Sequence, residues 1–275
     1  MNSIYPTNIG FKLTRKDFSI SPSFKKNNLP KNTIIRIYGL SGVGKGRLSA
    51  NLSSALNIPN LDTGKVFRAV CFVYLDQNFS DINPENTSKV FSSLSFKIAN
   101  NQLQILYKNK ELTPTNLKST IIDANITNYS KHPNLRQQTY DLILNLIVNK
   151  INTACLTDAR GASEDYIDKA EAMGYKIIRI LVDVDFDTKL SRYYEENKYA
   201  MERELGRTLR VDEREKLYKK LWKVMKERDN KDLEISKSGQ WQLISSDSAI
   251  LDTGEYNIQD GFHLVLNYIL SLDLK

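Results

Sequence analysis

The chain has 275 residues, of which 41% are hydrophobic and 26% charged, and its formal net charge is +7. This length and composition predict a globular protein with a buried core, built as one large domain or two modest ones, and exclude a disordered or fibrous chain. No stretch reaches the ~18 apolar residues of a membrane span. Residues 1–31 lack the apolar core of a signal peptide. The sequence therefore predicts a cytoplasmic protein that does not enter membranes.

The positive charge favours anionic partners, which include nucleic acid, membrane surfaces and phosphorylated small molecules. Because Lys and Arg are spread along the chain without a run of like charges, much of this charge is expected to be solvated surface. The two cysteines, Cys71 and Cys155, lie far apart among apolar neighbours. They are predicted to be reduced, buried thiols, and no Cys or His cluster has the spacing of zinc ligands.

The first predicted element lies in the N-terminal extension, residues 1–31, which carries three prolines. The alternating apolar residues Ile9, Phe11 and Leu13 predict a short edge strand there. The apolar run from Thr33 to Tyr38 predicts a buried strand that ends in a glycine turn. Apolar residues at helical spacing then predict a helix that begins near Lys45.

Strands and helices continue to alternate along the rest of the chain. Further strands are predicted at Ala154–Thr157, Ile177–Val182 and Ala249–Leu251, and helices at Tyr140–Ile151, Glu164–Met173 and Ile258–Leu272. Such alternation is typical of an α/β fold with a mostly parallel sheet between two helical layers. The predicted fold is therefore a three-layer α/β/α sandwich.

Two segments interrupt this alternation. Between Leu94 and Tyr107, two stretches of alternating apolar residues flank Asn100-Asn101, which predicts a hairpin and a small antiparallel insert. The segment from Arg192 to Asp232 is dense in charge and in helix-forming residues. It is expected to form exposed helices that stand off the core.

The glycine turn carries the clearest chemical signal. Its residues are Gly39, Leu40, Ser41, Gly42, Val43, Gly44, Lys45 and Gly46, which match the phosphate-binding pattern G-x-x-x-x-G-K. Glycines allow backbone N–H groups to converge on one anion, and the following helix adds its positive end. Gly46 and Arg47 stand where a Mg²⁺-binding hydroxyl is usual. Residues 39–47 are therefore predicted to bind a nucleoside triphosphate in a fold of the P-loop NTPase type, without a direct Ser/Thr–Mg²⁺ bond.

A second motif follows the loop. Leu61-Asp62-Thr63-Gly64 precedes Phe67-Arg68-Ala69-Val70. With the Gly-Lys-Gly loop, this resembles the bacterial cytidylate kinases (CMP/dCMP kinases), whose pattern is GPSGSGKGT and then LDTG-x-x-YRAV. The resemblance runs from about Ile34 to the C-terminus. It implies one nucleoside monophosphate kinase domain over residues 32–275, with an insert at about 84–124 that binds the monophosphate and a lid at about 190–232.

The resemblance also implies roles for individual residues. The family holds the acceptor's phosphate at positions matching Thr63 and Arg68, and reads cytosine at positions matching Thr127 and Arg136. Asp158-Ala159-Arg160-Gly161 stands where the family has Asp-Gly-Arg-Asp. Arg228-Asp229 and Asp232 match its R-D-x-x-D motif, with Asp232 on the ribose hydroxyls. The implied catalytic residues are Lys45, Asp158, Arg160 and Arg192, and the implied CMP site is Thr63, Arg68, Thr127, Arg136, Arg160 and Asp232.

The resemblance implies ATP and CMP or dCMP as partners, a monomer, and Mg²⁺ held through water near Asp158, with no protein atom bonded directly to the metal. Three positions depart from the family pattern. Arg47 replaces a Thr, Gly161 replaces an Asp that helps to recognise the base, and Ile235 stands where the family has a phosphate-binding Arg. These departures leave room for a kinase of broader base specificity or a catalytically weak nucleotide-binding protein. RNA binding is disfavoured, because no patch interleaves aromatic and basic residues.

Overall fold

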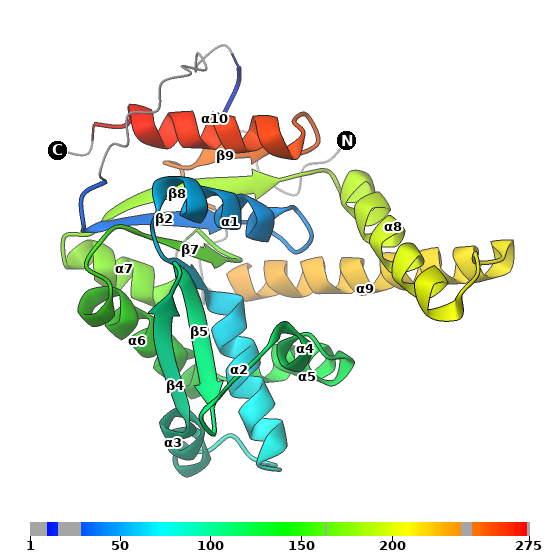
Figure 1. Cartoon of the computed structure of the whole chain (residues 1–275), viewed down its shortest axis with the longest axis horizontal. Helices are drawn as coiled ribbons and strands as arrows, with labels where there is room; N and C mark the ends of the chain where they lie inside the picture. Colours follow the sequence, from blue (N-terminus) through cyan, green and yellow to red (C-terminus); the bar gives the residue numbers. More distant parts are fainter. Residues whose placement is uncertain (1–9, 16–28, 163, 238–243, 274–275) are drawn as a thin grey trace.

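A single mixed sheet forms the centre of the molecule in the computed structural model, which describes residues 10–15, 29–162, 164–237 and 244–273 (Figure 1). Within these residues the sheet has nine strands in the order β1-β9-β8-β2-β7-β3-β5-β4, and β6 pairs with β5. The strands are β1 (Phe11–Lys12), β2 (Thr33–Tyr38), β3 (Asn60–Asp62), β4 (Leu94–Ala99), β5 (Gln102–Tyr107), β6 (Lys110–Glu111), β7 (Cys155–Ala159), β8 (Lys176–Asp183) and β9 (Ala249–Asp252).

Helices cover both faces of this sheet. They are α1 (Lys45–Leu56), α2 (Thr63–Asp76), α3 (Pro84–Ser93), α4 (Pro114–Leu117), α5 (Thr120–Lys131), α6 (Pro133–Lys150), α7 (Asp165–Ala172), α8 (Phe186–Leu205), α9 (Val211–Lys237) and α10 (Ile258–Ser271). The pairings of β1, β9, β8, β2, β7 and β3 are all parallel. The predicted α/β/α sandwich with a mostly parallel sheet is therefore confirmed.

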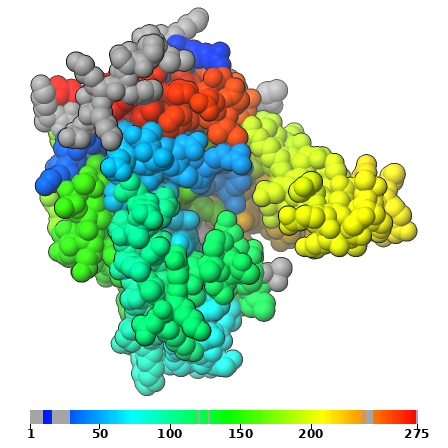
Figure 2. Space-filling model, in the orientation of Figure 1, coloured from blue at the N-terminus to red at the C-terminus, as the bar shows by residue number. Residues whose placement is uncertain are grey.

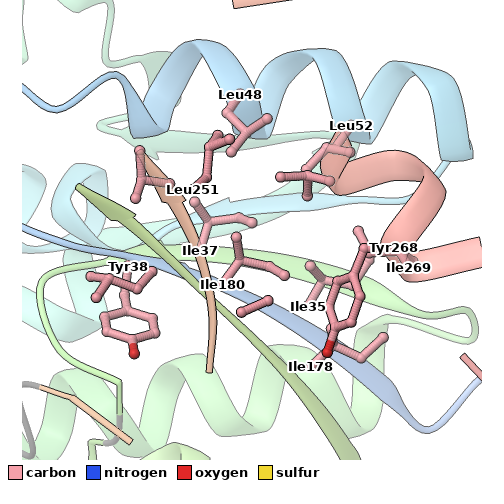
Figure 3. Packing of buried hydrophobic residues seen from close by; sticks show 14 of the residues in the cluster. Ile35, Ile37, Tyr38, Leu48, Leu52, Ile178, Ile180, Leu251, Tyr268 and Ile269 are labelled. Atoms are coloured by element: carbon pink, nitrogen blue, oxygen red, sulfur yellow. The ribbon is translucent and has the colours of Figure 1, made fainter. Parts of the chain in front are cut away.

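The central strand β2 shows why the sheet lies in the middle. All six of its residues are buried, as expected for a parallel strand covered on both faces. Ile35 and Ile37 point into a core shared with α1 and α10, where Leu52 and Ile269 pack (Figure 3). Ile34 points into the other core, which α2, α6 and α7 cover. The two cores follow from the alternation of side chains along a strand.

The predicted hairpin is confirmed as β4 and β5, which pair from Leu94↔Tyr107 to Ala99↔Gln102. Asn100 and Asn101 form the turn with φ of 51° and 58°, the backbone conformation that two-residue hairpins favour. The hairpin does not form a separate sheet, however. β5 also pairs in parallel with β3 at Asn60↔Gln102, so the insert extends the main sheet.

Helix α8 and the first part of α9 stand away from the sheet as an arm, as the charged segment predicted (Figures 1 and 2). The C-terminal part of α9 runs back toward the sheet, where Asp229 and Asp232 are buried (Figure 1). The arm has a small hydrophobic core of its own, made of Leu190, Leu209, Leu217, Leu221 and Met225. Two helices that bury apolar residues mainly against each other can move as a unit.

Two further predictions concern single elements. The edge strand is confirmed for Phe11–Lys12, which pairs with β9, whereas Ile9 lies outside the described residues. Cys71 and Cys155 are both free and buried, as predicted. Among the described residues, no helix combines the length and the hydropathy that crossing a bilayer requires.

Candidate nucleotide site

The glycine turn joins β2 to α1 through three glycines with positive φ. The values are 142° at Gly39, 79° at Gly42 and 99° at Gly44, a region that residues with a side chain avoid. A Cβ at Gly39 would lie 2.2 Å from the carbonyl oxygen of Val182, so only glycine fits there. The structure thus places the predicted residues 39–47 in one turn at the N-terminus of a 12-residue helix, where N–H groups and the helix dipole favour an anion.

Lys45 begins α1 and lies in a charged surrounding. Its ammonium donates a hydrogen bond to the carbonyl oxygen of Leu40 at 2.7 Å. Burial lowers its pKa to about 8, although the negative charge of Asp158 opposes this effect. A Lys held only by one main-chain carbonyl can exchange this partner for a phosphate oxygen.

Two carboxylates end neighbouring strands beside this Lys. Asp62 of β3 and Asp158 of β7 are register partners, and a Cβ at Gly46 would lie 3.8 Å from Oδ2 of Asp158. Burial raises the pKa of Asp158 to about 6, Lys45 lowers it, and the neighbouring Asp62 raises it further. Thr63, which is buried, donates from Oγ1 to the carbonyl oxygen of Asp158 at 2.8 Å, so its hydroxyl stabilises this strand end.

These carboxylates fit a magnesium ion. Mg²⁺ prefers oxygen ligands and is usually bound by one or two carboxylates together with waters and substrate phosphates. Asp62 and Asp158 supply that donor set next to the phosphate turn. The site has two carboxylates, and among the described residues there is no group of three or more His, Cys, Asp or Glu that could hold a metal ion.

Arg160, directly after β7, contacts Asp232 of α9. Nη1 of Arg160 forms an ion pair with Oδ2 of Asp232 on α9. Arg228 lies one helical turn earlier, and burial together with the charge of Arg160 lowers its pKa to about 10. The charges of Arg160, Arg228 and Asp232 all act on Lys45. The structure thus brings Lys45, Asp158, Arg160 and Asp232 together, as the sequence predicted.

Arg68 extends this cluster toward the insert. Its Nη1 forms an ion pair with Oδ1 of Asp123 at 2.7 Å and donates to the carbonyl oxygen of Leu117 at 2.9 Å. The charge of Arg68 also lowers the pKa of Arg228. Arg68 therefore lies where α2, the insert and α9 converge.

The residues predicted to read the base lie at the start of α6 and in α5. Arg136 is buried and donates from Nε to the carbonyl oxygen of Ser130 at 2.8 Å. It lines an open pocket with Pro133, Gln137, Tyr140 and Asp165. Thr127 is part of α5, but its side chain lies outside the described residues, as does that of Ile235.

A buried Arg supports the turn after Arg160 from beneath. Arg36 of β2 donates to the carbonyl oxygen of Gly161 from Nε at 3.0 Å and from Nη2 at 2.9 Å. Its Nη2 also pairs with Oε2 of the buried Glu164 at 2.8 Å. The carbonyl of Gly161 is therefore directed toward the interior of the protein.

Arg192 takes a different position from the other predicted catalytic residues. It donates to Oγ1 of Thr253 at 3.1 Å and to the carbonyl oxygen of Thr253 at 2.6 Å. Thr253 in turn donates to the carbonyl oxygen of Val43 in the phosphate turn at 3.2 Å. Arg192 therefore contacts the β9–α10 loop, next to the turn, instead of the Arg160–Asp232 pair.

Lys189, one turn before Arg192, joins α8 to α9 beside the phosphate turn. Its ammonium forms an ion pair with Asp229 of α9, and both side chains are almost fully buried, at 2% and 3% exposure. Its Cγ lies 3.3 Å from the position that a Cβ would take at Gly42. The base of α8 thus packs directly on the turn.

Sequence reasoning missed the contributions of Asp62, Asp123, Lys189 and Thr253. A signal existed for Asp62, because two neighbouring strands, β3 and β7, both carry an Asp near their carboxyl ends. The ion pairs of Asp123 and Lys189 join residues 55 and 40 positions apart. No pattern in one sequence marks such pairs.

A parallel sheet whose central strand leads through a glycine turn to a Lys, with an Asp on the adjacent strand, defines a P-loop α/β nucleotide-binding protein. A family model described as cytidylate kinase matches residues 35–271 of the chain. The chain therefore belongs to the cytidylate kinase family, a family of nucleoside monophosphate kinases.

Individual relatives are similar over most of their length. A cytidylate kinase from Mycoplasma capricolum is 23% identical over 240 residues, which are 87% of this chain and 97% of the relative. A cytidylate kinase from Aquifex aeolicus is 25% identical over 237 residues, 86% of this chain and 95% of the relative. Among solved structures, a putative kinase from Chloroflexus aurantiacus is 13% identical, covers 89% of this chain and 100% of its own, and gives a TM-score of 0.41.

Proposed function

We propose that this protein transfers the γ-phosphoryl group of ATP to the phosphate of CMP and dCMP, forming CDP or dCDP and ADP. The observation that carries the proposal is the cluster of Lys45, Asp158, Arg160 and Asp232 at the end of the phosphate turn. In this cluster, Lys45 and Arg160 provide positive charges for two phosphate groups, beside a turn of main-chain N–H groups. Phosphoryl transfer depends mainly on such positioning and charge neutralisation.

The donor nucleotide would lie along the phosphate turn. The N–H groups of residues 39–46 and the start of α1 would hold the β-phosphate, and Lys45 would leave the carbonyl of Leu40 to reach the γ-phosphate. Asp158, with Asp62 beside it, would hold Mg²⁺ through water. When bound, Mg²⁺ would neutralise charge on the β- and γ-phosphates.

The acceptor would lie between the insert and the arm. Arg68 and Arg160 would bind its phosphate by forked hydrogen bonds, and Asp232 would accept hydrogen bonds from its ribose. Thr127 and Arg136 would contact the base. An oxygen of the acceptor phosphate then attacks the γ-phosphorus in line, and the bond to the bridging oxygen of ADP breaks. Arg228 is already buried beside Arg160, and closure of α8 and α9 would exclude the water that otherwise hydrolyses ATP.

A second candidate is the same reaction with a broader set of monophosphates. The observation that favours it is Gly161, whose carbonyl is bound to Arg36 and which has no side chain to read a base. A catalytically weak nucleotide-binding protein is the remaining alternative, because Arg47 is exposed and replaces the last hydroxyl of the family loop.

A coupled assay of ADP release over CMP, dCMP, UMP and AMP separates these candidates. We expect CMP and dCMP to give the highest kcat/KM, and Lys45→Ala to lower kcat by roughly 10³-fold with every acceptor. Comparable rates with UMP or AMP would favour the broader kinase. ATP binding without acceptor-dependent ADP release would reject the kinase proposal. The monomeric state and the cytoplasmic location stay predictions, which sedimentation and cell fractionation would check.

A further inference from the structure

The short segment from Gly10 to Arg15 is fixed to the edge of the sheet. Phe11 donates its N–H to the carbonyl oxygen of Ser248 at 3.0 Å, and Leu13 donates to that of Ile250 at 2.9 Å. The side chain of Leu13 is fully buried in the core that α1 and α10 share. These bonds hold the segment parallel to β9, so its charged side chains have defined positions.

Those side chains reach the loop that joins β9 to α10. Nζ of Lys12 pairs with Oε1 of Glu255 at 2.7 Å and with Oδ2 of Asp252 at 3.3 Å. Arg15 pairs with Asp260 and lies over the ring of Tyr256, 5.8 Å from its centroid. The N-terminal segment therefore contacts the end of β9 at Asp252, the loop at Glu255 and Tyr256, and the first turn of α10 at Asp260.

The same loop also contacts the nucleotide site. The other carboxylate oxygen of Asp252 accepts the N–H of Gly254 at 2.9 Å, which fixes the turn at Thr253. The N–H of Thr253 donates to the carbonyl oxygen of Asp183 at 2.8 Å. Its hydroxyl donates to Val43 of the phosphate turn, and Arg192 binds its carbonyl oxygen. Side-chain pairing and the backbone of residues 252–254 thus connect Lys12 to Thr253, whose hydroxyl lies 3.2 Å from the carbonyl oxygen of Val43 and 3.3 Å from that of Asp183.

We propose that the segment Gly10–Arg15 is a positioning element for the donor nucleotide, acting through the Thr253 loop. The proposal rests on the function proposed above and adds a part of the chain outside the kinase motifs. A loop that contributes to a binding site weakens binding when it must be ordered first. By pairing with Asp252, Glu255 and Asp260, Lys12 and Arg15 keep this loop ordered before ATP arrives.

The alternative is that the segment only adds stability to the sheet. The two roles predict different changes. Loss of order in the Thr253 loop should weaken the binding of ATP alone, whereas loss of stability should change the apparent affinity for ATP and CMP equally. The test variant is Lys12→Ala/Arg15→Ala, because both side chains are exposed and Leu13 stays in the core. The conservative pair Lys12→Arg/Arg15→Lys keeps the charges. Lys89→Ala, which removes an exposed pair with Glu85 on α3, is the matched control.

We expect the double Ala variant to raise both the KM for ATP and the Kd of a non-hydrolysable ATP analogue by about threefold to tenfold, the size that loss of two or three exposed pairs allows. The kcat and the KM for CMP should stay within about twofold, as should all constants of the Lys89→Ala control. The conservative pair should restore the wild-type values. An unchanged KM for ATP, or equal increases for ATP and CMP, would overturn the proposal.

Hydrogen exchange gives a readout that does not need turnover. In the double Ala variant we expect faster exchange of the N–H groups of Thr253 and Gly254, with unchanged exchange in α3 and a similar Tm. If the wild-type protein shows no kinase activity, the proposed function fails. The exchange of Thr253 and Gly254 and the Kd of the ATP analogue then decide the present proposal by themselves, and unchanged values would overturn it.

Discussion

The two halves of the site are held together in different ways. The donor half consists of backbone: three glycines with positive φ, the first turn of α1, and a loop fixed by Thr253. The acceptor half consists of arginine side chains, and each of them already has a partner in the protein. Arg68 is paired with Asp123, and Arg160 with Asp232.

This difference has a physical consequence. Backbone N–H groups in a fixed turn are arranged before the ligand arrives, so binding costs little reorganisation. An arginine that is bound to a carboxylate must give up or share that contact when a phosphate binds. We therefore expect donor affinity to depend on a few fixed groups, and acceptor affinity to depend on competition between the substrate and carboxylates of the chain.

The largest expected effect comes from removing the side chain of Lys45, which is proposed to bind the γ-phosphate of the donor. Lys45→Ala should lower kcat by roughly 10³-fold, because a preorganised group that stabilises transition-state charge contributes on this scale. Steady-state and single-turnover assays would measure it, with Lys89→Ala as the control. Retention of more than a tenth of the wild-type kcat would contradict the role of Lys45.

The two helices of the arm are joined, next to the phosphate turn, by the buried pair of Lys189 and Asp229, which a substitution can break. Lys189→Met keeps the alkyl packing on Gly42 but leaves Asp229 buried without its cation. Loss of one partner of a buried ion pair costs about 3–5 kcal/mol, so urea unfolding should show a decrease of that size. Lys198→Met removes an exposed pair with Glu195 and should cost at most about 1 kcal/mol. Equal decreases in the free energy of unfolding for the two substitutions would refute the stabilising role of the buried Lys189–Asp229 pair.

The charges next to the turn predict the pH dependence of kcat/KM, which reports groups of the free enzyme. When the pH falls below the pKa of Asp158, which is about 6, this carboxylate binds a proton and loses the negative charge that attracts a metal ion. When the pH rises above the pKa of Lys45, which is about 8, the ammonium loses a proton and no longer attracts phosphate. We expect a bell-shaped profile that falls about tenfold per pH unit on either side. The residual activity of Asp158→Asn should lack the acidic limb, and a flat profile from pH 5 to 9 would be inconsistent with these assignments.

The smallest expected effect sharpens the view of the acceptor half. Asp123→Asn removes the carboxylate charge that holds Arg68, so the KM for CMP should fall by about twofold to fivefold, the range of an exposed ion pair. The KM for ATP should not change. A rise in the KM for CMP would show that Asp123 orients Arg68 for the substrate and does not compete with it. Glu85→Gln, which breaks the exposed pair with Lys89, is the control.

Much of the fold was predictable because its signals are local. The run at Thr33–Tyr38, the glycines after it and the helical spacing from Lys45 follow directly from backbone and packing rules, and so does the Asn100-Asn101 turn. The pairing of the insert with the main sheet was not predictable. It rests on one register position, Asn60↔Gln102, which joins segments whose sequences show no common feature.

The candidate site divides in the same way. Lys45, Asp158, Arg160 and Asp232 were proposed from motifs, and the structure brings them together. The partners that hold them were not visible. Asp229 lies in the segment Arg192–Asp232, whose charge density indicates a solvated surface, yet it forms one of the most buried pairs with Lys189. Whether two charges on different helices meet depends on helix packing, which a single sequence does not reveal.

The most direct test of the account is a crystal structure with a non-hydrolysable ATP analogue and CMP bound together. The account predicts the β-phosphate within the N–H groups of residues 39–46, Lys45 on the γ-phosphate, and the phosphate of CMP between Arg68 and Arg160. A triphosphate bound away from the glycine turn, or a CMP phosphate that contacts neither arginine, would contradict it.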